Sequence, residues 1–584
     1  MSVYEDLKAR ADARWQELTA GEKPWIRIGT ELNGQAAGAL EVVEALLSEL
    51  EGRGIEADID EVGTLGLSYA EPLVDVLKPG KPRLLFSRVT AEDVPTIIDE
   101  YIIGDRVPER LAFAYLGDDP IDGVPDLNTV PQYSLQRRIA MRNAGHIAPG
   151  DILQYIANDG YAALNKALFE MEPSDVIDEM KTSNLRGRGG AGFPAGLKWS
   201  FMVNSPGPVK YIACNCEEGD PGAFNDKAIL ESDPHTLLEG MILAGYATGA
   251  TNGYVFVRHG HDGPIDRAEK AIEDAYAENI LGKNILGSDF SFDIEVALTG
   301  DSYVAGEETG MMEAIEGKRS MPRFKPPFPA AAGLWMKPTT INNVKTFSYA
   351  PQIVLNGGEW FSNIGVNNST GTAIACLTGN VTYPGIYEVE MGMTMGQVIE
   401  EIGGGVPDGK QMKLLQTGGP LGGVIGLESL DLHIDFDEMQ QAGAMFGSGG
   451  IIVGDEDASV VDLIRVLVAF CQYESCGKCF PCRIGMTQLL DQVERIARFE
   501  GRPGDMEACE RVGTTMKIGS LCAHGQLGFN PISSALTHFR EEFETHITER
   551  RDPTGRTSTK FYVPKSTRPY AEDFSQAQPL KVNI

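Results

Sequence analysis

Three cysteines at a regular spacing form the clearest chemical signal in the sequence, Cys476-Gly-Lys-Cys479-Phe-Pro-Cys482. Three thiolates at this spacing can surround one corner of a cuboidal iron–sulfur cluster, and a [4Fe–4S] site takes four Cys ligands. We expect the fourth ligand to be Cys522, with Cys509 and Cys471 as alternatives. Zinc is the less favoured metal, because zinc sites usually combine two CxxC pairs or one such pair with histidines.

A glycine-rich segment, Gly187 to Gly192, matches the GxGxxG pattern literally. A dinucleotide-binding fingerprint should follow a strand and open a helix, whereas residues 176–181 look helical and Phe193-Pro194 follows at once. The Rossmann context is therefore absent. The segment can still offer backbone N–H groups to a phosphate, with Arg188 and Lys198 adding positive charge. A glycine-rich turn without a ligand is the alternative.

Two further loops combine carboxylates with glycine. The first, Asn215 to Gly222, directly follows an expected strand, and the second is Tyr303 to Thr309. Several carboxylates beyond the end of a strand are costly unless they face solvent, a metal or a ligand. A metal site could use these acids, but hydrogen bonds to ribose, ribityl or nicotinamide groups fit the neighbouring glycine loop better.

The elements that position these residues follow from hydrophobic periodicity. Short strands at 25–28 and 83–86 and an amphipathic helix over 37–50 predict a small α/β unit ending near residue 120. The middle of the chain mixes helices with strands at 209–213 and 253–257, and nearly all the glycine-rich loops lie there.

The last third reads differently. Residues 370–440 show short strands and tight turns around one helix, which predicts a β-grasp-like domain. From residue 458 helical periodicity returns, which predicts a helix bundle carrying the cysteine triplet. Residues 551–584 are polar, contain four prolines and show no periodicity, so we expect an extended arm.

Composition excludes several classes of function. The 584 residues allow three or four domains, and 42% are hydrophobic. A formal net charge of −33 argues against nucleic acid and anionic membranes as partners. No signal peptide or membrane-length apolar run is visible, so we expect a cytoplasmic chain that reaches a membrane only through partners. Nine cysteines clustered late in the chain favour metal or redox chemistry over disulfides.

At this point the residues resemble a family, the NADH-binding FMN/[4Fe–4S] flavoprotein subunit of respiratory complex I (51 kDa type). Its soluble relatives occur in NAD-dependent formate dehydrogenases and multimeric hydrogenases. The similar motifs appear in the expected order between about residues 180 and 525; they are 186–199, 218–224, 303–309, 322–329, 337–344 and 474–483.

The resemblance implies roles for particular residues. Hydride would pass directly between nicotinamide and flavin, so no catalytic side chain is expected. Expected FMN-binding residues are Gly187, Arg188, Gly189, Gly190, Lys198, Asn215, Glu217, Tyr303, Gly306, Glu307, Asn342 and Asn343. Expected NADH-binding residues are Phe193, Phe201, Asp220, Glu308, Lys325 and Phe328. Expected cluster ligands are Cys476, Cys479, Cys482 and Cys522.

The N-terminal unit resembles the thioredoxin-like ferredoxin domains of the same superfamily, which hold [2Fe–2S] with four cysteines. In this sequence those positions fall on Ile28, Asn33, Thr64 and Ser68. None is cysteine, so we expect a structural or docking module without a cluster.

The expected fold is a multidomain α/β protein. Its parts would be a thioredoxin-like domain without ligands (1–125), a Rossmann-like FMN/NADH domain (150–355), a β-grasp, ubiquitin-like domain (365–445), a helix bundle with the cluster (455–548) and a C-terminal arm (549–584). The expected function is an NAD(H)-dependent oxidoreductase subunit. Its expected partners are a thioredoxin-like [2Fe–2S] subunit and a large iron–sulfur or catalytic subunit. The alternatives are a stand-alone FMN diaphorase and a redox-inactive scaffold.

Overall fold

The computed structural model describes residues 2–300 and 302–555, so most of the predicted C-terminal arm lies outside the described residues. The chain divides into two compact units after Asp455. The first unit contains three larger β-sheets with their helices, and the described part of the second contains helices only. The prediction of a mixed α/β fold is confirmed.

The first sheet of unit 1 has the strand order β2-β1-β3-β4-β5. β1 (Trp25–Gly29) pairs in parallel with β2 (Asp58–Val62) and antiparallel with β3 (Val74–Leu77). β4 (Arg83–Phe86) and β5 (Ala112–Leu116) extend the sheet antiparallel. The apolar side chains of β1, β3 and β4 form one core with α3, which spans Ala39–Arg53.

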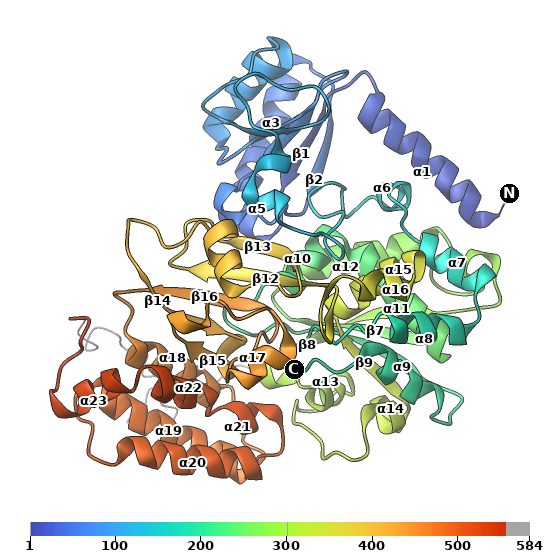
Figure 1. The fold of residues 1–584 in the computed structure, drawn as a ribbon. Helices are drawn as coiled ribbons and strands as arrows, with labels where there is room; N and C mark the ends of the chain where they lie inside the picture. Colours follow the sequence, from blue (N-terminus) through green and yellow to red (C-terminus); the bar gives the residue numbers. More distant parts are fainter. Residues whose placement is uncertain (1, 301, 556–584) are drawn as a thin grey trace, which may run out of the picture. The chain divides into compact units, whose positions relative to one another are not determined.

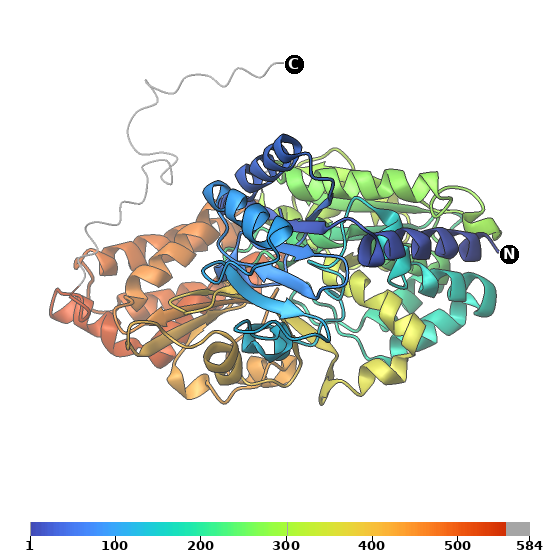
Figure 2. The ribbon, with the colours of Figure 1, turned by 90° about the horizontal axis from the view of Figure 1, so that it is seen from above.

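The first helix does not cover this sheet. α1 (Val3–Ala20) lies beside α6 (Ile152–Ala157) (Figure 1; Figure 2), and near its C-terminal end Trp15 meets Trp25 of β1 with ring centroids 5.6 Å apart. Lys8 Nζ donates to the carbonyls of Ile156 and Ala157, 3.3 and 2.8 Å away. Hydrogen bonds therefore connect the N-terminal helix to α6.

The second sheet is entirely parallel, with the order β8-β7-β6-β9. Its strands are β6 (Tyr211–Cys216), β7 (Asn252–Arg258), β8 (Asp293–Thr299) and β9 (Thr339–Asn343). β7 and β8 follow β6 on one side, and β9 then returns to pair with β6 on the other. The strand order therefore reverses between β6 and β9, and in open α/β sheets ligands bind at the carboxyl ends of the strands beside such a reversal.

Buried helices hold this sheet in place. α11 (Pro234–Thr248) is buried along almost its whole length and packs against α15 (Val344–Asn356). A Cβ at Gly240 of α11 would lie 2.1 Å from the carbonyl oxygen of Phe347, so glycine is what allows this close approach.

The third sheet has the order β13-β12-β16-β14-β15 and ends unit 1. β12 (Thr372–Gly379) lies between its antiparallel neighbour β13 (Gly385–Glu390) and its parallel neighbour β16 (Gly450–Asp455). The remaining strands are β14 (Met412–Thr417) and β15 (Gly423–Ile425). A helical segment over Gln397–Ile402 lies where the sequence predicts the helix of this domain.

The described part of unit 2 is made of helices. They are α18 (Val460–Tyr473), α19 (Phe480–Ala497), α20 (Asp505–Gly519), α21 (Ala523–Leu527), α22 (Asn530–His538) and α23 (Arg540–Thr548). Figure 1 shows them in orange and red. All four predicted cluster ligands belong to this unit.

Candidate functional site

The carboxyl edge of the parallel sheet gathers residues from three strands. Asn215 near the end of β6 pairs in register with Asn343 at the end of β9. Asn215 Nδ2 donates to the carbonyl of Gly306, 2.7 Å away, in the short helix after β8. Glu217, directly after β6, lies so close to Gly306 that a Cβ there would be 2.9 Å from its carboxylate. Four residues predicted to bind FMN thus meet at one place.

The glycine loop reaches the same edge from outside the sheet. It connects α8 (Pro173–Thr182) to α9 (Ala195–Val203), so no strand precedes it, as the sequence indicates. The N–H of Gly187 donates to the Phe193 carbonyl at 2.8 Å and closes the loop. A Cβ at Gly189 would lie 2.9 Å from Cβ of Asn343, so this backbone passes directly over the end of β9.

Arg188 is held by contacts within the protein. Its side chain is only 2% exposed, and its guanidinium donates to the carbonyls of Arg186, Thr370 and Thr372. Its backbone N–H donates to Thr346 Oγ1. These donors brace the glycine loop against the start of the third sheet.

A cluster of two cations and two carboxylates lies at the start of α13, which spans Glu308–Ile315. Lys325 Nζ is 3.0 Å from Glu307 and 2.8 Å from Glu308, and Lys198 Nζ is 3.3 Å from Glu308. Burial alone would raise the pKa of Glu308, but the two ammonium groups outweigh it and the pKa is lowered. Glu308 is therefore a carboxylate at neutral pH.

Asp220 joins two sheets of unit 1. Its two carboxylate oxygens accept hydrogen bonds from the Tyr303 hydroxyl at 2.7 Å and the Ser448 hydroxyl at 2.6 Å. Tyr303 follows β8, whereas Ser448 shortly precedes β16 of the third sheet. A Cβ at Gly419 would lie within 3 Å of the same carboxylate. The third sheet therefore contributes to the wall of the site.

Three aromatic rings predicted to contact NADH are exposed. Phe193, Phe201 and Phe328 have 46%, 47% and 60% of their surface accessible. The rings of Phe193 and Phe201 lie 6.3 Å apart between centroids. Exposed rings of this kind offer an apolar face on which a planar base can stack.

Four residues of this region were not predicted from the sequence. Trp199 Nε1 donates to Asn342 Oδ1 at 3.0 Å, Asp226 accepts from Asn343, and Lys345 and Ser448 lie beside them. The sequence showed only the position of two of them: Trp199 ends the 186–199 motif, and Lys345 lies two residues after the Asn-Asn pair. Its burial against Asp226 depends on packing between α10 (Asn225–Ser232) and α15.

In unit 2 the cysteine triplet lies between α18 and α19. Cys476 and Cys479 belong to the connecting loop, and Cys482 to the first turn of α19. Cys522 caps the N-terminus of α21, where a Cβ at Gly525 would lie 2.8 Å from Cβ of Cys482. Burial, together with the nearby sulfurs of Cys479, Cys522 and Cys476, raises the pKa of the Cys482 thiol to about 12.

The two alternative fourth ligands, Cys509 and Cys471, are both buried. The Cys509 thiol is buried and lies 2.9 Å from Gln492 Oε1. Cys471 is buried in α18, and its carbonyl contacts the His524 ring. Within residues 2–300 and 302–555, no three His, Cys, Asp or Glu side chains are arranged to hold a single metal ion. Cys522, by contrast, lies close enough to the triplet to influence the pKa of Cys482.

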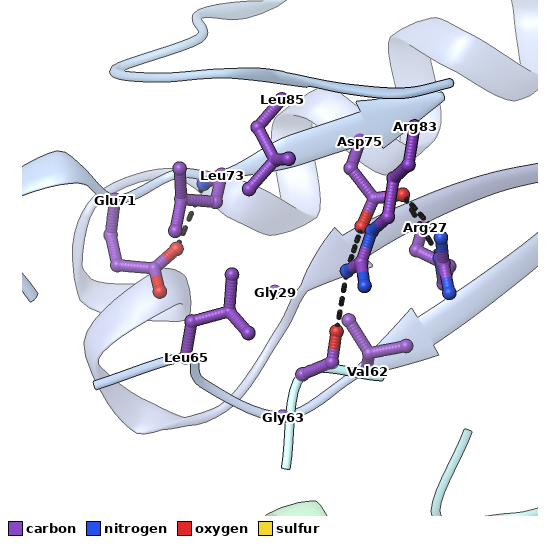
Figure 3. Close-up of a pocket in the computed structure, with 11 residues that line it drawn as sticks. Arg27, Gly29, Val62, Gly63, Leu65, Glu71, Leu73, Asp75, Arg83 and Leu85 are labelled. Carbon is purple, nitrogen blue, oxygen red and sulfur yellow. Dashed lines mark hydrogen bonds and ion pairs between the residues drawn. The ribbon is translucent and has the colours of Figure 1, made fainter. Parts of the chain in front are cut away.

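In the N-terminal domain, three of the four positions that the resemblance predicts to replace [2Fe–2S] ligands take part in side-chain hydrogen bonds. Asn33 Nδ2 donates to Ser68 Oγ at 3.1 Å, and Thr64 Oγ1 donates to Glu71 at 3.4 Å. The cavity beside them measures about 10 Å³, room for no more than one water molecule. Figure 3 shows Glu71 on one side of it and the ion pairs of Asp75 on the other. That this domain carries no cluster stays a prediction from its residue types.

Comparison with known proteins matches three regions of this chain. Residues 180–352 match the Nuo51 FMN-binding domain, residues 462–546 the NADH-ubiquinone oxidoreductase-F iron-sulfur binding region, and residues 374–425 the SLBB domain. An F-type subunit of the NADH-quinone oxidoreductase of Rhizobium meliloti (strain 1021) is 44% identical over 416 residues, which cover 71% of this chain and 99% of that protein. The chain belongs to the family of NADH-quinone oxidoreductase F-type subunits.

Other relatives of this F-type chain extend the comparison. The NADP-reducing hydrogenase subunit HndC of Solidesulfovibrio fructosivorans is 45% identical over 418 residues, covering 72% of this chain and 85% of the relative. A chain of the crystal structure of an NAD+-reducing [NiFe]-hydrogenase in the H2-reduced state aligns with a TM-score of 0.63 and 25% identity. That alignment covers 93% of this chain and 88% of the hydrogenase chain.

Family membership confirms several predictions. The chain is an NADH dehydrogenase-type oxidoreductase subunit with an FMN-binding domain and a [4Fe–4S]-binding region. It belongs with subunits of multisubunit complexes, which favours the subunit prediction over the stand-alone diaphorase and the inactive scaffold. Across the described ranges, no helix is both long and apolar enough to cross a membrane.

Proposed function

We propose that this subunit exchanges electrons between NAD(H), FMN and one [4Fe–4S] cluster, and passes them to or takes them from a partner subunit. The observation that carries the proposal is the meeting of the FMN-assigned and NADH-assigned residues at the carboxyl edge of β6 and β9. FMN, when bound, supplies a carrier that takes two electrons together from NADH and releases them one at a time.

FMN binding is assigned to the glycine loop and the ends of the strands. The phosphate donors are the N–H groups of Gly189 and Gly190, since those of Gly187 and Arg188 already donate within the protein. Arg188 holds the loop in place. The remaining FMN residues would orient the ring and the ribityl chain; they are Lys198, Asn215, Glu217, Tyr303, Gly306, Glu307, Asn342 and Asn343.

NADH binding is assigned to the exposed rings and the ionic cluster beside them. Phe193, Phe201 and Phe328 would stack on or shield the adenine. Lys325 would pair with a phosphate, and Asp220 and Glu308 would accept hydrogen bonds from nucleotide hydroxyls or amides.

The cluster ligands are assigned as Cys476, Cys479, Cys482 and Cys522. The support is the proximity of all four sulfurs in unit 2. The finer domain labels are part of the same proposal: thioredoxin-like (1–125), Rossmann-like FMN/NADH (150–355), β-grasp (365–445), cluster bundle (455–548) and arm (549–584).

The N-terminal domain would act as a structural module. Its Leu32 N–H donates to Glu231, and its Thr64 N–H donates to Ser232 Oγ, 3.1 and 3.3 Å away, so it is bonded to α10 of the flavin-binding segment. The proposed partners are a thioredoxin-like [2Fe–2S] subunit and a large iron–sulfur or catalytic subunit. A reducing compartment, the cytoplasm, suits nine cysteines that form no disulfide.

The test is an NADH-oxidation assay on the full chain loaded with FMN and iron, with ferricyanide or viologen as electron acceptor. NADH-dependent reduction of the dye, lost when FMN is removed and regained when it is added back, is expected. Absence of dye reduction by the FMN-loaded chain would show the proposal to be wrong.

A further inference from the structure

A buried lysine lies at the centre of a polar network that contacts residues assigned to FMN and NADH. Lys345 is the second residue of α15 and is only 2% exposed. Its Nζ donates to Asn225 Oδ1 and Asp226 Oδ1, both 2.6 Å away, and to the Ser448 carbonyl at 3.3 Å. An ammonium so deeply buried is costly unless it is paired and hydrogen-bonded, and all three contacts meet that need.

One branch of the network reaches Asn343, which is assigned to FMN. The second oxygen of Asp226 accepts a short hydrogen bond from Asn343 Nδ2. Asn343 Oδ1 accepts from the Lys345 N–H at 3.0 Å and caps α15. Both ends of the Asn343 amide are therefore held, and its Nδ2 binds the same carboxylate that Lys345 Nζ binds.

The other branch reaches Asp220, which is assigned to NADH. Asn225 Nδ2 donates to the Ser448 carbonyl at 2.8 Å, and the Ser448 hydroxyl donates to Asp220 at 2.6 Å. The opposite oxygen of Asp220 accepts from Tyr303, another FMN-assigned residue. Hydrogen bonds through Lys345 and Ser448 thus connect residues assigned to FMN with a residue assigned to NADH.

The charge state of this lysine is well defined. Burial opposes its charged form, but the carboxylates of Asp226 and Glu218 outweigh burial, so the pKa of Lys345 is raised. Lys345 is therefore cationic across the physiological range, and its ammonium lies 2.6 Å from Asp226 Oδ1.

We propose that Lys345 is a positioning residue that, through Asp226 and Ser448, holds Asn343 and Asp220 in one arrangement and supplies a positive charge next to these residues. The inference rests on the proposed function, because it uses the assignment of those two residues to FMN and NADH. It adds a residue to the site and makes the third sheet, through Ser448, a part of it.

The test compares Lys345→Met with Asp226→Asn. Lys345→Met removes a positive charge and Asp226→Asn a negative one, so the flavin midpoint potential should fall in the first variant and rise in the second. Both should weaken FMN binding to the apo-protein by about tenfold, because a hydrogen bond to a charged group is lost. FMN affinity is read by fluorescence titration and the potential by a spectroelectrochemical titration.

Two further variants separate positioning from folding. Lys345→Met combined with Asp226→Asn restores neutrality, so its potential should return toward that of the wild type while its FMN affinity stays weak. Lys337→Met makes the same substitution at an exposed lysine two residues before the start of β9. It should change neither the flavin potential nor the FMN affinity.

The outcomes are distinct. Opposite shifts of potential support the inference. The inference is wrong if the flavin potential shifts in the same direction in both single variants. It is also wrong if the potential is unchanged in both while FMN content falls equally, because Lys345 would then be a structural residue only. If the wild-type chain itself bound no FMN, or its flavin were not reduced by NADH, the proposed function would fail instead.

Discussion

Replacing Gly189 with alanine tests the placement of the glycine loop most directly. The backbone of Gly189 does not have the positive φ that favours glycine, so alanine is allowed there by its own conformation. The added Cβ, however, would lie 2.9 Å from Cβ of Asn343 and 3.6 Å from its Cγ. Carbon atoms normally approach to about 3.5–4.0 Å, so one of the two segments must move by roughly 0.6–1 Å.

Asn343 is the segment that resists this movement. Its backbone ends β9 in register with Asn215, and its side chain is held by Asp226 and by the N-terminus of α15. We therefore expect the glycine loop to shift. Overpacking of this kind costs about 1–3 kcal/mol. If the loop relaxes in the apo-protein and must be pushed back by FMN, that cost corresponds to about 5- to 150-fold weaker FMN binding.

The assay is a fluorescence titration of apo-protein with FMN, together with the thermal unfolding temperature of the apo-protein. Gly52→Ala is the matched control, because a Cβ at Gly52 in α3 meets no atom within 4 Å. It should leave FMN affinity unchanged. An affinity of Gly189→Ala within twofold of the wild type would refute the close passage of this loop over β9.

Three further predictions concern other parts of the chain. Lys325→Ala should raise KM for NADH about tenfold while FMN content stays near that of the wild type, since it removes a cation assigned to phosphate; equal loss of flavin would reverse the assignment. Cys522→Ala should lower iron from about four atoms per chain while FMN is still bleached by NADH, whereas Cys509→Ala should leave iron unchanged; the opposite pattern would make Cys509 the ligand. Burial raises the pKa of the Glu71 carboxyl above its usual 4.5. Just above pH 4.5 the folded protein therefore keeps a proton that the unfolded chain has already lost. The free energy of unfolding consequently falls as the pH rises past 4.5. The midpoint of thermal unfolding of Glu71→Gln should therefore fall less between pH 5 and pH 8 than that of the wild type, and parallel curves would contradict this.

The cysteine triplet shows what could be read from the sequence. Cys476, Cys479 and Cys482 lie within one short loop and the turn that follows it, so their spacing alone restricts how far apart the sulfurs can be. The choice of Cys522 rested on its Gly-Ser-Leu context. Its proximity depends on α21 packing against α19 through Gly525, which no local pattern reveals.

For the glycine loop, too, the sequence predicted one part and the folded structure decided another. Its composition predicted a close backbone approach and correctly excluded a preceding strand. The sequence also predicted that Arg188 adds positive charge beside the loop and contacts FMN, and this stays a prediction. The guanidinium finds carbonyl acceptors on Thr370 and Thr372, more than 180 residues further along the chain, and only the folded arrangement brings them within reach.

By itself, the sequence determined the chemistry that is available: which thiols, amides, carboxylates and glycines are present, in what local order, and that no cysteine stands at positions 28, 33, 64 and 68. Only the tertiary structure decided which of them meet. The return of β9 beside β6 places Asn343 next to Asn215, and the packing of α15 on α10 buries Lys345 against Asp226. The physical reason is that local spacing constrains groups within about one turn of chain, whereas contacts between distant segments arise from burial of apolar surface, and that same burial makes isolated charges pair.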